Sequence, residues 1–208
     1  MDFKSSDVKL WREALSSYPT RIESLKKPNL ATLDHFYRNL LPPLIRQRSP
    51  NPHITTSELA QLMQPRLLDF VSSLEDEIVK SASEKAFKSL PDVSKAVSEL
   101  TVMKGVGPAT ASAVLAAYSP DVAPFMSDEA MVAALGSSKD YTLKQYLVFV
   151  DKLQAKAKEL SATGDTFTPS DVERALWSSS VGSKLPAAQS GPDSEAGTNK
   201  RTKRKRKI

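Results

Sequence analysis

Cysteine is absent from this chain of 208 residues, and histidine occurs only twice, as His35 and His53. The absence of cysteine excludes disulfide bonds, cysteine nucleophiles, thiolate metal sites and cysteine-ligated iron–sulfur clusters. Two histidines are too few for the common zinc ligand sets, and a single histidine among polar neighbours is typical of a solvated side chain. We therefore expect neither a metal ion nor another cofactor.

Long apolar runs are also missing, since no segment approaches the roughly 18 residues that a membrane-spanning helix needs. The first residues, Met1 to Lys4, show no signal-peptide pattern. Hydrophobic residues make up 40% of the chain, which is enough for the core of one domain of ordinary size. We expect one domain over residues 1–181 that is monomeric and does not associate with a membrane.

The alternation of apolar and polar residues that marks a half-buried strand does not occur either. Apolar residues instead recur at helical spacing, which predicts an all-α fold, with the second segment ending at Pro42 and Pro43. The predicted helical segments are 7–18, 30–41, 55–63, 67–87, 92–100, 141–160 and a last helix from 168 onward.

Positive charge is concentrated at one end of the chain. Residues 182–208 carry eight basic and two acidic side chains, a net charge of +6, so subtraction from the chain total of +5 leaves −1 for residues 1–181. The segment 185–199 is rich in Pro, Gly, Ser and Ala, which predicts a disordered linker. The basic cluster after it predicts nuclear import through an import receptor, or a DNA-contacting arm, or both; its members are Lys200, Arg201, Lys203, Arg204, Lys205, Arg206 and Lys207.

A helix-hairpin-helix pattern occupies residues 92–118, with Gly105-Val106-Gly107 at its turn. Two glycines at this spacing favour a turn too tight for side chains, because only glycine enters positive φ freely. Pro108 then stands at the first position of the second helix, where its missing N–H costs nothing. Free backbone N–H groups at such a helix N-terminus favour a phosphate. An ordinary helix corner without a ligand is the alternative.

The run from Leu100 to Ala130 resembles the hairpin and following loop of the helix-hairpin-helix DNA glycosylase superfamily. That resemblance implies contact with the DNA backbone, without sequence specificity, through Lys104, Gly105, Val106, Gly107 and Thr110. It also implies that Asp128, in Pro124-Phe125-Met126-Ser127-Asp128, is the catalytic aspartate that acts on a flipped nucleotide. The fold it implies is an all-helical glycosylase-like bundle in which the base enters a cleft between two lobes.

Two positions depart from the pattern of that superfamily. Ala109 stands where bifunctional members carry a nucleophilic lysine, which excludes Schiff-base chemistry there. Ala130 stands where the family often has a histidine. Any glycosylase would therefore be monofunctional, with Asp128 directing water. Asp128 also has a structural interpretation, since Ser127 or Asp128 is placed to cap the helix that follows.

The sequence leaves three classes of function open. The first is a nuclear DNA-binding protein that is also a monofunctional base-excision glycosylase. The second is a catalytically inactive nuclear scaffold or binding module that contacts DNA mainly through its basic tail, which the near-neutral body favours. The third is an RNA-binding hairpin protein, because a glycine hairpin does not distinguish the two sugars.

Overall fold

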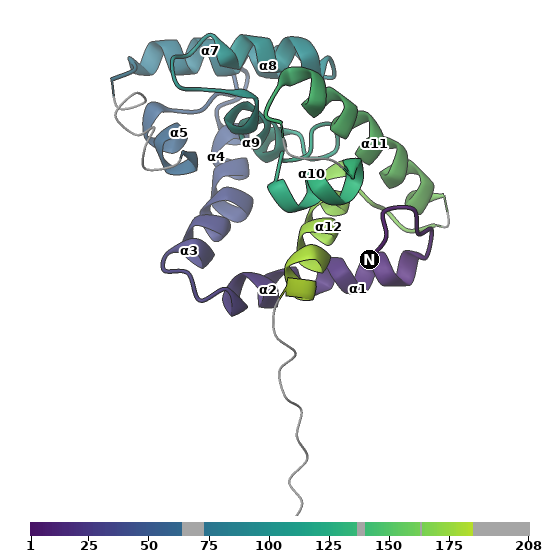
Figure 1. Cartoon of the computed structure of the whole chain (residues 1–208). Helices are drawn as coiled ribbons and strands as arrows, with labels where there is room; N and C mark the ends of the chain where they lie inside the picture. Colours follow the sequence, from purple (N-terminus) through teal and green to yellow (C-terminus); the bar gives the residue numbers. More distant parts are fainter. Residues whose placement is uncertain (64–72, 137–139, 163, 185–208) are drawn as a thin grey trace, which may run out of the picture.

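The computed structural model describes residues 1–63, 73–136, 140–162 and 164–184 of the chain. Within these ranges the protein is built from helices, and no strand occurs (Figure 1). The prediction of an all-α fold is therefore confirmed for the described residues. In chain order the helices are α1 (Val8–Ser16), α2 (Tyr18–Ser24), α3 (Leu30–His35), the π-helical segment η1 (Phe36–Leu40), α4 (Leu41–Gln47), α5 (Thr56–Leu62), α7 (Asp76–Ser89), α8 (Val93–Thr101), α9 (Pro108–Tyr118), α10 (Asp128–Leu135), α11 (Leu143–Ser161) and α12 (Pro169–Lys184).

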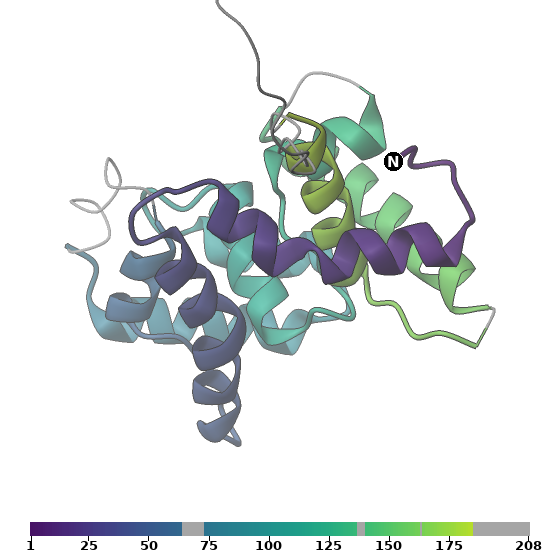
Figure 2. The same ribbon diagram turned by 90° about the horizontal axis from the view of Figure 1, so that it is seen from below.

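The last helix, α12, lies between the first two helices of the chain and the helices that directly precede it in the sequence. It packs against α1, α2, α10 and α11, and α1 and α2 cross one side of it (Figure 2). The other helices follow an arc from α3 and α4 through α5, α7 and α8, and the arc returns to the centre along α9 (Figure 1). One buried cluster runs through these elements and includes Trp11, Leu115, Phe149 and Leu176. The two ends of the described chain thus share one core with the hairpin.

Several helix starts follow directly from local sequence. Thr55 caps α5 in a capping box with Glu58, as the sequence predicts. Asp92 accepts a hydrogen bond from the backbone N–H of Lys95 at the start of α8. Thr142 accepts one in the same way at the start of α11. These caps satisfy backbone N–H groups at the helix starts through residues that are close in the sequence.

The prediction that Pro42 and Pro43 end a helix is wrong. The helical path continues through α4, in whose first turn both prolines lie. The π-helical turn of η1, which is wider than an α-helical turn, comes just before them. In it the N–H of Leu41 donates to the carbonyl of Phe36, five residues earlier. A proline at the start of a new helical turn loses no hydrogen bond, because N–H groups there have no intrahelical acceptor.

Three other boundaries differ from the predictions. The segment 7–18 ends as a helix at Ser16, and α2 then starts with Pro19 in its first turn, because proline has no N–H to continue α1. The predicted helix 67–87 falls partly outside the described residues, and its described part is helical only from Asp76. The final helix reaches Lys184, so residues 182–184 extend the helical body and not the tail.

Candidate nucleic-acid interface

The hairpin turn joins α8 to α9. Gly105 has a φ of 87°, in the left-handed region that favours glycine. Gly107 instead has a φ of −99° and a ψ of 179°, which is extended backbone open to any residue. The prediction that both glycines are needed for the turn is therefore wrong for Gly107.

Two buried side chains hold the turn against the core, namely Met103 and Val106, which are 2% and 6% exposed. The N–H of Val106 donates to the carbonyl of Met103 at 3.1 Å. Val106 was a predicted phosphate-binding residue, but its side chain and its N–H both serve the turn. Its contribution is to fix the position of the glycines on either side.

The N-terminus of α9 lacks a side-chain cap. Gly107 is the N-cap residue and has no side chain, and Pro108 follows at the first helical position. Lys104 and Gly107 are exposed, and Thr110 is half-buried. A Cβ atom added to Gly107 would meet nothing within 4 Å. Neither backbone conformation nor packing thus requires a glycine here, and its effect is to leave the space before α9 open.

Asp128 is the first residue of α10, and Ser127 is its N-cap. The helix thus begins where the capping interpretation predicts, but the Ser127 side chain makes no capping hydrogen bond. The Ser127 hydroxyl donates instead to Glu173 Oε1 at 2.5 Å. Asp128 Oδ1 accepts a hydrogen bond from the Tyr141 hydroxyl at 2.5 Å, which fixes the orientation of the carboxylate.

A cavity of about 220 Å³ lies at Asp128, between α10 and the end of α12. Its polar lining includes Glu129, Ser180 and Lys184, and Lys184 Nζ lies 3.6 Å from Glu129 Oε1. Ala130, at the family's histidine position, is fully buried and does not line the cavity. The carboxylates of Asp128 and Glu129 are therefore the titratable acids at this cavity among the described residues.

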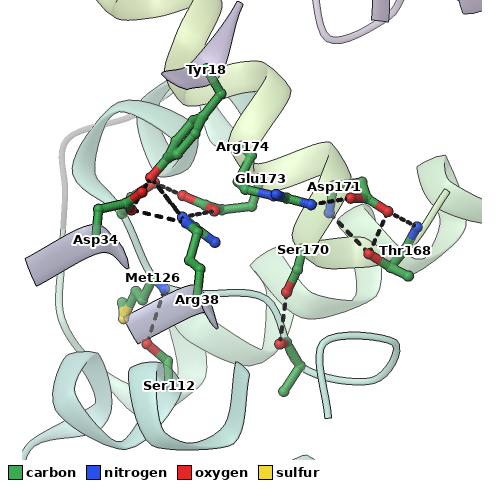
Figure 3. A network of polar contacts seen from close by, with 12 residues as sticks. Tyr18, Asp34, Arg38, Ser112, Met126, Thr168, Ser170, Asp171, Glu173 and Arg174 are labelled. Atoms are coloured by element: carbon green, nitrogen blue, oxygen red, sulfur yellow. Dashed lines mark hydrogen bonds and ion pairs between the residues drawn. The ribbon is translucent and has the colours of Figure 1, made fainter. Parts of the chain in front are cut away.

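Among the hydrogen bonds that connect the loop before Asp128 to the rest of the protein, one joins it to α9 and another to α11. The N–H of Met126 donates to Ser112 Oγ at 2.9 Å, one turn into α9 (Figure 3). The buried Tyr146 hydroxyl of α11 donates to the carbonyl of Pro124 at 2.9 Å. The hairpin helix and the loop that carries the predicted catalytic aspartate are consequently hydrogen-bonded to each other and share one core.

Sequence analysis missed a polar network centred on Arg38 (Figure 3). Arg38 Nε donates to Asp34 Oδ1 at 3.0 Å and to the Tyr18 hydroxyl at 3.1 Å. Arg38 Nη2 lies 3.7 Å from Glu173 Oε2. The signal in the sequence is weak. It consists of Arg38 within an otherwise apolar and aromatic helix face and of Glu173 between the buried residues Val172 and Ala175.

Glu173 is 1% exposed. Its burial raises the pKa of the carboxyl group, and this outweighs the lowering by Arg38 and by the Ser127 hydrogen bond. Burial by itself lowers the pKa of Arg38, but the charge of Glu173 and other neighbours raises it above its ordinary value. The arginine therefore keeps its charge, while the glutamate binds a proton more readily than an exposed one does.

The remaining predicted site residues, from Lys200 to Lys207, lie outside the described residues. Among the described residues no group of three or more His, Cys, Asp or Glu side chains is placed to hold a metal ion. No described helix is both long and apolar enough to cross a membrane.

Comparison of the chain with protein-family models, with curated proteins and with solved structures gave no match.

Proposed function

We propose that the protein binds the phosphate backbone of nucleic acid, in the first place DNA, without sequence specificity and through the hairpin of residues 104–110. The observation that carries this proposal is Gly107. It is an exposed N-cap residue without a side-chain cap, at a position where a side chain would fit and would be unstrained. An open helix N-terminus presents N–H groups and a positive dipole end to an anion.

Lys104 supports the same proposal by its position. It is exposed in the turn between the two helices, and a lysine beside a helix N-terminus adds a positive charge that is attracted to phosphate. Because all these contacts involve phosphate and not base edges, the hairpin gives affinity without a sequence preference. The sugar does not take part, so RNA is the natural competitor to include in any assay.

The test is a DNA-binding titration across a salt series with Gly107→Ala in the full chain. In every protein of this series the basic residues from Lys200 to Lys207 are changed to glutamine, so that DNA binding by the tail does not mask DNA binding by the hairpin. We expect Gly107→Ala to leave the free energy of unfolding nearly unchanged and to weaken DNA binding about tenfold, because the new methyl group blocks charge-assisted hydrogen bonds.

Lys104→Gln provides a second measurement, with Lys95→Gln on the exposed face of α8 as its control. Loss of one phosphate contact lowers the slope of log K against log salt by about 0.9. If neither Gly107→Ala nor Lys104→Gln changes binding, and the tail substitutions abolish it, the hairpin is an ordinary helix corner. The alternative of a scaffold that contacts DNA through its tail then holds.

A second candidate function is monofunctional base excision with Asp128. The observation that favours it is the position of this carboxylate, half-exposed on a cavity and oriented by Tyr141. A carboxylate so placed is suited to stabilise a cationic sugar or to direct water. We expect Asp128→Asn to abolish release of damaged bases from duplex DNA, and Glu129→Gln, at the same cavity, to leave it intact. Equal release by both variants would exclude a catalytic role for Asp128.

A further inference from the structure

A second cavity, of about 200 Å³, lies at the far end of α9 from the hairpin. Its lining includes Ala116 and Ala117 in the last turns of that helix. At 1.5 Å per residue these positions lie about 12 Å along the helix from Pro108. The cavity is therefore distinct from the hairpin and also from the cavity at Asp128.

Three arginines from three different elements line this cavity, namely Arg38 of η1, Arg46 of α4 and Arg174 of α12. Ser170 also lines it, with its hydroxyl group donating to the carbonyl of Ala123, and no acidic side chain among the described residues lines the cavity. Asp34 and Glu173 already compensate the charge of Arg38, and Asp171 compensates that of Arg174, so the charge of Arg46 is the one in the lining without a paired carboxylate among the described residues. The composition of the lining thus points to a negatively charged ligand.

Carboxylates outside the cavity hold two of the three guanidinium groups in place (Figure 3). Asp34 and the Tyr18 hydroxyl occupy Nε of Arg38, and Asp171 binds Nη2 of Arg174. These contacts leave donors unused. Nε of Arg174 is buried without a hydrogen-bond partner among the described residues. The hydrogen bonds of Arg38 use Nε and Nη2, and its guanidinium group also lies over the rings of Tyr18 and Tyr37.

Arg46 differs from the other two because it is exposed and makes no ion pair with any described residue. Its guanidinium group carries five N–H donors in a planar fork that matches the oxygens of a phosphate group. One arginine without a partner beside two that are already oriented is an arrangement that a tetrahedral anion with several acceptor oxygens would complete.

We propose that this cavity binds a phosphate group through Arg38, Arg46 and Arg174. The phosphate belongs either to a small phosphorylated molecule or to the end of a nucleic acid strand. The chemistry of recognition is the same in both cases, and the experiment separates the two sources.

The test follows the amide chemical shifts of Ser170 and Ala117 in the full chain by NMR during titration with inorganic phosphate. Parallel titrations use a short oligonucleotide with a terminal phosphate and the same oligonucleotide without it. These site-resolved shifts are insensitive to anions that bind the basic tail. We expect saturable shifts with inorganic phosphate, with the phosphorylated oligonucleotide, or with both, and whichever binds more tightly identifies the source.

Arg46→Gln is the decisive variant, because an exposed side chain without an ion pair can be replaced without unfolding the protein. We expect it to weaken binding at Ser170 about tenfold and Arg46→Lys to weaken it less. Lys9→Gln, an equal change of charge on the exposed face of α1, serves as the control. Absence of saturable shifts in the unchanged protein, or equal weakening by Lys9→Gln and Arg46→Gln, would overturn the proposal.

Discussion

Gly105 and Gly107 stand two residues apart in the hairpin, yet only Gly105 is held in a conformation that side chains avoid. With a φ of 87°, Gly105→Ala forces an alanine into the left-handed region at a cost of about 1 kcal/mol or more. Gly107→Ala has an ordinary φ and open space, so it is the matched control. We expect urea denaturation to show a loss of stability for the first variant only. Equal losses would mean that the fold also requires a glycine at position 107, so that the missing side chain there would not indicate a ligand.

A buried acid with a raised pKa makes stability depend on pH in a defined direction. Glu173 holds its proton more tightly in the folded protein than in the unfolded chain, where its pKa is near 4.5. The unfolded state then releases this proton first as the pH rises, so the contribution of Glu173 to stability falls above about pH 4.5 and levels off beyond the folded pKa.

Glu173→Gln removes this titration. We expect the stability of the variant relative to the unchanged protein to increase as the pH rises through that window, measured by urea denaturation at a series of pH values. Glu13→Gln, on an exposed part of α1, is the control for a simple loss of charge. A difference between Glu173→Gln and the unchanged protein that is constant with pH would contradict the raised pKa.

At the scale of elements, the position of α8 depends on a local cap and on tertiary packing together. Asp92 accepts the N–H of Lys95 at 3.0 Å, while Val93, Ala96, Val97 and Leu100 face the core. We expect Asp92→Ala to lower the free energy of unfolding by about 1 kcal/mol and to leave DNA affinity unchanged, because the buried face still sets the position of the helix. Weaker DNA binding by folded Asp92→Ala protein would show that the cap also positions the hairpin.

The path from α3 through η1 to α4 shows where reasoning from the sequence fails at this scale. A proline pair normally indicates a helix end, but the wider turn of η1 shifts the hydrogen-bonding register so that Pro42 and Pro43 fall in a first helical turn. The periodicity of the apolar residues does not reveal such a shift. Single π-turns within helices are frequent at functional positions. This one contains Arg38, the central residue of the polar network.

At the scale of the whole molecule, charge is divided between a nearly neutral body and a strongly basic end. Changing the basic residues from Lys200 to Lys207 to glutamine is expected to move a fluorescently tagged full chain from the nucleus to the whole cell, because import receptors bind dense basic clusters. Lys144→Gln on α11, which is exposed, is the control. Unchanged nuclear accumulation of the tail variant would refute import through this cluster.

The sequence by itself determined the features that depend on neighbours in the chain. The helical spacing, the helix start at Thr55 and the glycine requirement at Gly105 all arise from contacts within a few residues, so local physical chemistry was enough to predict them. Tertiary structure decided the rest. Arg38 lies near Glu173, and the Ser127 hydroxyl donates to Glu173 and not to a backbone group at the start of α10, because packing of α12 against distant helices brings these side chains together. The arginine-lined cavity exists for the same reason, since its charges come from parts of the chain that no local pattern connects.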